Sequence, residues 1–193
     1  MRARQTSPEL RRRGLSRAKP RGLPDLWLLS DERNDAELER ALRRLPRGSG
    51  FVYRHHHLPP DERIARWFAL LRVARARHHL AILADSALTA RAWGADGVYG
   101  APRALYPTRR LLTLATAHSL REVGLANRAR ADAVLLSPAF ATRSHPGAKA
   151  LGAARFRLLA TRAAMPVIAL GGLTPRAARR LGWPRWAAID GLS

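Results

Sequence analysis

The stretch PVIALGGLTP, residues 166–175, is the most informative part of the sequence for the architecture. Its apolar run, residues 166–170, predicts a buried strand, because the run is short and ends at a pair of glycines. A helix is predicted directly afterwards, over residues 175–181, where a proline opens the helical stretch. A strand that leads through a tight turn into a helix is typical of proteins built on a parallel sheet.

The same alternation of short apolar runs and helical stretches extends from residue 24 to the end of the sequence. The predicted strands are residues 26–29, 50–53, 80–83, 97–99, 111–114, 133–136, 166–170 and 187–189. The predicted helices are residues 35–44, 60–77, 85–93, 120–128, 153–163 and 175–181. Eight such strands in about 170 residues fit a compact (β/α)₈ TIM barrel, formed by residues 23–193 as a single domain that lacks a clear final helix. An open doubly wound sheet is the alternative, but no Gly-x-Gly-x-x-Gly follows the first strand.

Composition narrows the class of protein. The chain has 193 residues, of which 47% are apolar, enough for one domain with a substantial core. It has no cysteine, which excludes disulfides, thiolate zinc sites and a cysteine nucleophile. No apolar run approaches the roughly 20 residues needed to span a bilayer, and no secretory signal is visible. We therefore predict a cytoplasmic protein with no membrane partner.

The formal net charge is +21, which first suggests a nucleic-acid partner. Residues 1–22 hold eight basic residues against Glu9, and we expect them to form a disordered basic extension. The remaining charge is scattered along the chain, nearly all of it arginine, and aromatic residues do not interleave with it as a base-stacking surface requires. A nucleic-acid partner is therefore not expected.

The carboxyl ends of barrel strands face the active site, so the residues that follow each predicted strand are the candidates for chemistry. Gly171 and Gly172, between a strand and a helix, allow backbone N–H groups to approach a phosphate closely. The loop after the sixth strand offers the hydroxyl groups of Thr142 and Ser144, which can donate to phosphate oxygens. Arg54, at the end of the second strand, is suited to clamp a diphosphate because its planar guanidinium is always charged.

Two further strand ends suggest a metal. Residues 55–57 are three histidines, but no second histidine cluster with carboxylate support follows at ligand spacing, which disfavours zinc. Asp85, after the third strand, is the carboxylate placed to hold Mg²⁺ through an oxygen ligand.

Taken together, these strand ends resemble the thiamine phosphate synthase and TenI-like thiazole tautomerase family of small (β/α)₈ barrels. The most specific matches are residues 95–98 (ADGV), the loop of residues 137–152 and residues 169–173 (ALGGL). The resemblance implies that an aminopyrimidine methyl diphosphate loses pyrophosphate and is joined to a thiazole phosphate. It implies Mg²⁺ as the cofactor and phosphorylated small molecules as the partners.

The resemblance also implies roles for residues. The pyrimidine diphosphate is assigned to Arg54, His56, Thr116 and His145. The thiazole phosphate is assigned to Thr142, Ser144, Gly171, Gly172 and Ile189, and the metal to Asp85. The chain departs from the family pattern at His56 and His145, which replace lysines, at Ala104, where a second metal carboxylate is missing, and at Asp190, which replaces a serine.

Two alternatives stay open at this point. A TenI-like tautomerase would act on the thiazole phosphate without a metal and would use His118 to move the proton. A non-catalytic barrel would bind a thiamine-related ligand. The sequence also leaves the oligomeric state open, a homo-oligomer included.

Overall fold

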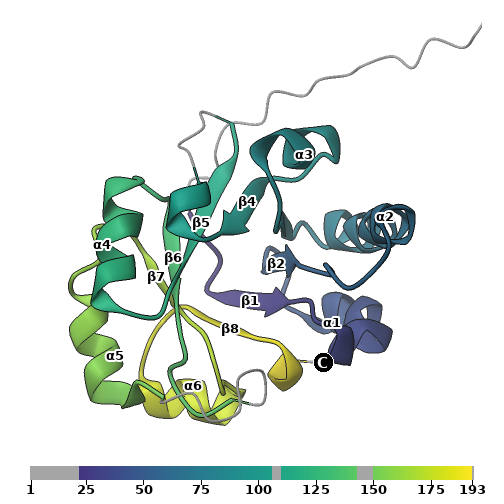
Figure 1. Ribbon diagram of the computed structural model, residues 1–193. Coiled ribbons are helices and arrows are strands. Elements are labelled where there is room, and N and C mark those ends of the chain that lie inside the picture. Colours follow the sequence, from purple (N-terminus) through teal and green to yellow (C-terminus); the bar gives the residue numbers. More distant parts are fainter. Residues whose placement is uncertain (1–21, 106–109, 143–149, 193) are drawn as a thin grey trace, which may run out of the picture.

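The computed structural model describes residues 22–105, 110–142 and 150–192, which form a closed barrel of parallel strands (Figure 1). The strands are β1 (Leu26–Leu29), β2 (Gly50–Tyr53), β3 (Leu80–Leu83), β4 (Gly97–Gly100), β5 (Leu112–Ala117), β6 (Ala133–Leu136), β7 (Val167–Ala169) and β8 (Trp186–Ala188). Each strand pairs with the next in sequence, and β8 returns to β1. The predicted (β/α)₈ barrel is confirmed.

Helices surround the barrel and alternate with its strands (Figure 1). The α-helices are α1 (Leu38–Arg44), α2 (Pro60–Ala76), α3 (Ala87–Ala92), α4 (Leu120–Arg128), α5 (Gly152–Ala160) and α6 (Pro175–Leu181). Short 3₁₀ turns occupy Glu32–Glu37, Pro102–Ala104 and Asp190–Leu192. The turn Asp190–Leu192 is the only helical segment that the described part of the chain has after β8. None of the helices described is long and apolar enough to cross a bilayer.

Several element boundaries differ from the prediction by one to three residues, and two of these differences have a clear physical reason. The sequence predicts the first α-helix from residue 35, but Asp31 caps a 3₁₀ turn over Glu32–Glu37 through a capping box with Asn34, so α1 begins only at Leu38. The sequence also predicts that the fifth strand ends at residue 114. Strand β5 continues to Ala117, because its small residues still pair with β6 as far as Ala117 opposite Leu136.

The barrel interior is filled by side chains, as in other barrels of this kind. One buried cluster contains the inward residues of the strands: Trp27, Leu29, Val52, Ile82, Leu112, Leu114, Ala133, Leu135, Ile168, Leu170 and Ala187. Trp27 needs the space that Gly50 leaves on the neighbouring strand, because a Cβ at Gly50 would lie 2.0 Å from the indole. The indole nitrogen donates to the carbonyl oxygen of Pro24 at 2.8 Å, which satisfies its buried polar group.

A second, larger core lies between the outer face of the strands and the helices, with Phe51, Trp67 and Phe156 among its fully buried residues. The strand ladder is not uniform around the ring. Most neighbours share two to four residue pairs, whereas β7 and β8 share only the pair Ala169 and Trp186. The seam between β7 and β8 is thus the shortest ladder in the barrel.

Candidate active site

A cavity of about 880 Å³ opens at the carboxyl ends of the strands. Its walls come from the ends of β2, β4 and β5 and from the loops after β6, β7 and β8. The sequence-predicted residues that line it are Arg54, His118, Thr142, Gly171, Gly172 and Ile189. The volume lies in the usual range for a small-molecule site, about 300–1,000 Å³.

Gly171 and Gly172 shape one wall of this cavity. Both have positive φ, +98° and +62°, which disfavours other residues. A Cβ at Gly172 would lie 2.2 Å from the carbonyl oxygen of Ala141, so only glycine allows this turn to pack on the loop after β6. Their N–H groups donate no hydrogen bond to the described part of the chain and are available to a ligand. This is the arrangement that binds phosphate at the corresponding place in many barrels.

Arg54 enters the cavity from the end of β2 and is held by two neighbours. Its backbone N–H donates to the hydroxyl oxygen of Ser30 at 2.8 Å, and its Nη2 donates to Asp31 Oδ2 at 2.7 Å. Tyr99, from β4, lies in the same cavity. Burial raises the pKa of the Tyr99 phenol, although the Arg54 guanidinium opposes that shift, so the phenol stays protonated. The hydrogen bonds to Ser30 and Asp31 therefore hold the positive charge of Arg54 in place in the cavity wall.

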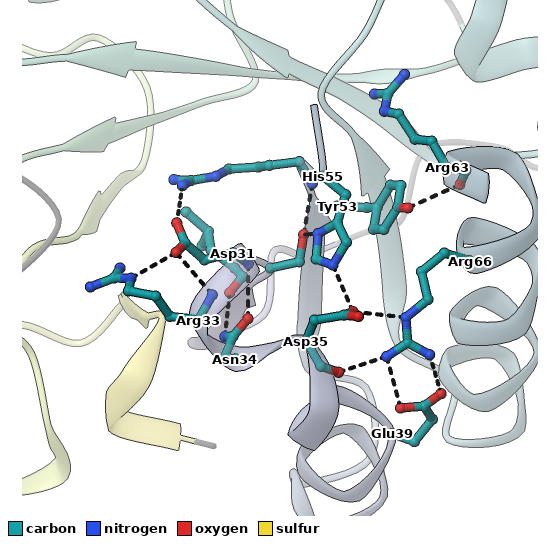
Figure 2. Close-up of polar contacts among 12 residues, drawn as sticks. Asp31, Arg33, Asn34, Asp35, Glu39, Tyr53, His55, Arg63 and Arg66 are labelled. Atoms are coloured by element: carbon teal, nitrogen blue, oxygen red, sulfur yellow. Dashed lines mark hydrogen bonds and ion pairs between the residues drawn. The ribbon is translucent and has the colours of Figure 1, made fainter. Parts of the chain in front are cut away.

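Asp190 places a carboxylate in the cavity, which by itself opposes phosphate binding. Arg33 Nη1 lies 3.3 Å from Asp190 Oδ2, and Arg33 Nε lies 2.7 Å from Asp31 Oδ1. Burial is the largest influence on the pKa of Asp31 and would raise it, but the hydrogen bonds from Arg33 and the charges of Arg33 and Arg54 together hold that pKa below its ordinary value. Ion pairs therefore form a chain of alternating charges through Arg54, Asp31, Arg33 and Asp190, whose first and last members line the cavity (Figure 2 shows the pairs around Asp31).

His118 lines the cavity from the end of β5. Its Nδ1 lies 3.1 Å from both the carbonyl oxygen and the hydroxyl oxygen of Ser137. A carbonyl oxygen only accepts, so this contact favours the tautomer with the proton on Nδ1. Nε2 has no hydrogen-bond partner among the described residues, and a nitrogen that can accept a proton is the requirement for the tautomerase role predicted for His118.

The structure does not bring every predicted residue into the cavity. Thr116 lies inside β5, where its hydroxyl contacts the carbonyl oxygen of Gly100 at 3.5 Å, and it does not line the wall. His56 is exposed outside the cavity, where desolvation and the nearby Arg63 guanidinium lower its pKa. Ser144 and His145 lie outside the described residues, so their roles stay predictions.

Asp85, the predicted magnesium ligand, also lies outside the cavity wall. Arg63 Nη1, from α2, donates to Asp85 Oδ2 at 2.7 Å, and the backbone N–H of Ser86 donates to Oδ1 at 2.7 Å. Burial is the largest influence on the pKa of this carboxyl and would raise it, but the hydrogen bonds from Arg63, Ser86 and Thr89 and the Arg63 charge together outweigh burial, so that the pKa is lowered. Both oxygens of Asp85 therefore already have partners within the protein.

A buried polar network behind Arg54 was missed by the sequence reasoning (Figure 2). His55 is buried, with Nδ1 2.9 Å from Ser30 Oγ and Nε2 2.6 Å from Asp35 Oδ1. Asp35 in turn accepts from Arg66 Nε at 2.7 Å, and Arg66 also pairs with Glu39. Burial lowers the pKa of His55 despite the opposing effect of Asp35, so the ring is neutral between these partners. The alternation of β2 could have signalled this, since His55 follows Tyr53 on the outward face.

The network fixes the backbone that carries Arg54. Ser30 accepts from the Arg54 N–H, which leaves the hydroxyl proton of Ser30 for His55 Nδ1. His55 then donates from Nε2 to Asp35. Every ring nitrogen of His55 has a protein partner, so this ring serves the fold of the β2 end.

Comparison with known proteins gives a consistent result. The chain matches the family model described as thiamine monophosphate synthase over residues 26–182. It is 29% identical over 160 residues to the thiamine-phosphate synthase of Chlorobium phaeobacteroides, covering 78% of this chain and 77% of that protein. It is 27% identical over 161 residues to the putative thiamine-phosphate synthase 2 of Aquifex aeolicus, covering 79% and 87% of the two chains.

Solved structures match the fold. The thiamine phosphate pyrophosphorylase from Pyrococcus furiosus superposes with a TM-score of 0.71 at 24% identity, covering 86% of this chain and 85% of that one. FabK from Thermotoga maritima also superposes, with a TM-score of 0.66 at 15% identity, over 88% of this chain and 58% of that one. At these identities the likeness shows a shared barrel architecture.

Proposed function

The chain belongs to the thiamine monophosphate synthase family, and from this premise we propose that it joins an aminopyrimidine methyl diphosphate to a thiazole phosphate with release of pyrophosphate. In this transfer the bond between the pyrimidine methylene carbon and the diphosphate oxygen breaks. The thiazole nitrogen then forms a bond to that carbon. The product is thiamine phosphate, and the enzyme is a transferase.

The observation that carries the proposal is the cavity itself. It contains a fixed guanidinium, Arg54, at the end of β2, and a glycine turn, Gly171 and Gly172, after β7, whose N–H groups donate to none of the described residues. The two substrates each carry a phosphate group of their own, and such a site needs two anion-binding elements around one reaction space. At about 880 Å³ the cavity has room for both rings.

Each element is assigned a task on this basis. The N–H groups of Gly171 and Gly172, together with Thr142, hold the thiazole phosphate, with Ile189 beside them. Arg54 stabilises the negative charge that develops on the departing pyrophosphate. The roles of His56, Thr116, Ser144 and His145 at the two phosphates stay predictions, as does the cytoplasmic location.

Whether the protein can hold Mg²⁺ depends on which side-chain oxygens are available as ligands. The resemblance assigns Mg²⁺ to Asp85, but both Asp85 oxygens are engaged, by Arg63 and by the Ser86 N–H. Among residues 22–105, 110–142 and 150–192, no group of three histidine, aspartate or glutamate side chains is arranged to hold a metal ion. The described residues therefore do not fit a protein-held Mg²⁺, and the tasks assigned above need none.

The activity is tested by mixing the purified protein with the two substrates and measuring thiamine phosphate by the fluorescence of its oxidised form. We expect turnover by the wild type and a loss of about 100-fold or more in kcat/KM for Arg54→Ala, because the departing charge loses its hydrogen-bond donor. Arg179→Ala, which removes one guanidinium from α6 outside the cavity lining, is the matched control. Absence of product from a folded protein that binds the thiazole phosphate contradicts the proposal.

The geometry of His118 supports a second candidate function, a tautomerase acting on the thiazole phosphate. His118 Nε2 is free for proton transfer while Nδ1 is held by Ser137. In this case the protein shifts a proton between two isomers of the thiazole phosphate, which ¹H NMR of the isolated ligand follows directly. Isomer exchange that disappears in His118→Gln, without formation of thiamine phosphate, would favour this function over the synthase.

A further inference from the structure

The ion pair between Arg63 and Asp85 occupies the position assigned to a metal. Asp85 follows Leu83, which faces the helices, and its carboxylate turns toward α2 rather than into the cavity. There it meets Arg63, whose Nη1 lies 2.7 Å from Oδ2 and whose Nη2 donates to the carbonyl oxygen of Ala84 at 3.1 Å. The guanidinium thus binds both the carboxylate and the backbone of the β3 end.

Arg63 is held too firmly to give way to a cation. Its side chain is 12% exposed, and the guanidinium carbon lies 5.2 Å from the ring centre of Trp93 and 6.0 Å from that of Tyr53. Arg63 Nε is buried and has no hydrogen-bond partner within the described part of the chain. If a metal took over Asp85, this guanidinium would be left buried without its counter-ion, which is strongly unfavourable.

The second carboxylate that a metal would need is also missing. The 3₁₀ turn Pro102–Ala104 follows β4, and it contains Arg103 and Ala104 where the family pattern places an acid. A divalent magnesium ion usually keeps at least one or two protein carboxylates along with the substrate phosphates. At these two strand ends, the chain offers one carboxylate, which is already neutralised by Arg63.

The positive charge that faces the cavity comes from Arg54 instead. Asp31 holds one side of this guanidinium at 2.7 Å, and Arg33 holds the other oxygen of Asp31 at 2.7 Å. Arg33 also pairs with Asp190, which lines the cavity. Asp31 therefore fixes where Arg54 points, and Arg33 offsets the negative charge of the Asp190 carboxylate in the cavity lining.

We propose that the diphosphate site of this chain is an arginine site, formed by Arg54, that needs no divalent cation held by the protein. Arg63 neutralises Asp85 outside the cavity, so that Asp85 holds no metal, and Asp31 is the positioning residue for Arg54. The identity of the ligand rests on the proposed function. The recognition chemistry, a diphosphate bound by a preorganised guanidinium, rests on the geometry alone.

The test uses inorganic pyrophosphate as the probe and measures its affinity for the full chain by calorimetry, once in EDTA and once with MgCl₂. We expect the two dissociation constants to agree within about threefold, because guanidinium groups supply the charge. Binding that is lost in EDTA and restored by Mg²⁺ would overturn the proposal. Failure of the proposed function leaves a different signature, namely pyrophosphate binding without any formation of thiamine phosphate.

Substitutions test the roles of the Asp85 and Asp31 carboxylates one at a time. The double variant R63M/D85N removes both charges together, which avoids a buried unpaired ion and keeps the fold. We expect it to bind pyrophosphate as the wild type does, whereas loss of binding in this folded variant would show that Asp85 serves the ligand.

Asp31→Asn is expected to weaken pyrophosphate binding by about tenfold, both in EDTA and in Mg²⁺, because Arg54 loses its anchor. In the full reaction, KM for the pyrimidine diphosphate should rise more than kcat falls. Asp61→Asn removes an equal charge from the exposed first turn of α2 and is the matched control. If both variants weaken pyrophosphate binding equally, the loss of one negative charge from the protein explains the effect, and the positioning role of Asp31 is overturned.

Discussion

Gly172 combines a positive φ with a contact that leaves no room for a Cβ. We expect Gly172→Ala to weaken binding of the thiazole phosphate by at least about tenfold and to lower the free energy of unfolding by about 1–3 kcal/mol, because the turn must move away from Ala141. Calorimetry with the thiazole phosphate and urea denaturation measure the two effects.

The matched control is Gly100→Ala at the end of β4. A Cβ at Gly100 would meet no atom within 4 Å and the residue has no positive φ, so the added methyl group should change neither quantity appreciably. Normal phosphate binding by a folded Gly172→Ala protein would remove this turn from the site.

At the scale of single residues, the position of a residue directly after a strand was a better guide to whether it lines the cavity than its chemical type was. Arg54 and the two glycines were predicted from their positions after strands, and they line the cavity because the carboxyl ends of the strands meet at one end of the barrel. The partner of Asp85 could not be predicted, because Arg63 lies on another element and nothing local pairs them. The same holds for Arg33, which links Asp31 to Asp190 at the opposite end of the chain.

At the scale of the elements, the contact between Trp27 on β1 and Gly50 on β2 makes a sharp stability test. A Cβ at Gly50 would lie 2.0 Å from the indole, so Gly50→Ala forces Trp27 out of the barrel interior. We expect the free energy of unfolding to fall by about 3 kcal/mol or more.

Gly124→Ala tests the opposite case within α4. A Cβ there meets only Arg128 Nη1, at 3.7 Å, and the residue is inside a helix. Alanine should therefore raise the free energy of unfolding by about 0.5–1 kcal/mol. Thermal denaturation of both variants measures the two changes in stability. A Gly50→Ala protein as stable as the wild type would show that Trp27 does not depend on the space beside Gly50.

The elements themselves were predicted closely where apolar runs were compact, as in β1, β2, β3 and β6, whose bounds match. The end of β5 was wrong because Ala115, Thr116 and Ala117 are small or polar, and periodicity alone gives such residues little weight. Their pairing with β6 keeps them in the strand, and that pairing is a long-range contact that a single sequence does not display.

At the scale of the whole molecule, buried histidines make stability depend on pH. Burial lowers the pKa of His55 and of His79 below the ordinary 6.5, so the folded protein binds fewer protons than the unfolded chain at mildly acidic pH. Stability is therefore full above pH 6.5 and falls as the pH decreases through and below that value. Urea denaturation between about pH 8 and pH 5 measures this trend.

His79→Asn should flatten that dependence, because it removes a group that the fold keeps neutral beside the carbonyl oxygen of Leu42. His78→Asn is the matched control, since His78 is exposed and its positive φ of 57° suits asparagine. An unchanged pH profile in His79→Asn would contradict this origin of the acid sensitivity.

The overall barrel could be predicted from one sequence because every level agreed: compact apolar runs, helical stretches of suitable length and turns at their junctions. The short ladder between β7 and β8 cannot be predicted from the sequence pattern, yet the loops that follow its two strands line the cavity. Gly171 and Gly172 follow one strand of this seam, and Ile189 follows the other. If a phosphate binds between these loops as we propose, it bridges the two strands where the ladder of the ring is shortest. The ligand then adds a contact across a seam that backbone pairing holds at a single residue pair, so we expect binding to stiffen the β7–β8 side of the barrel.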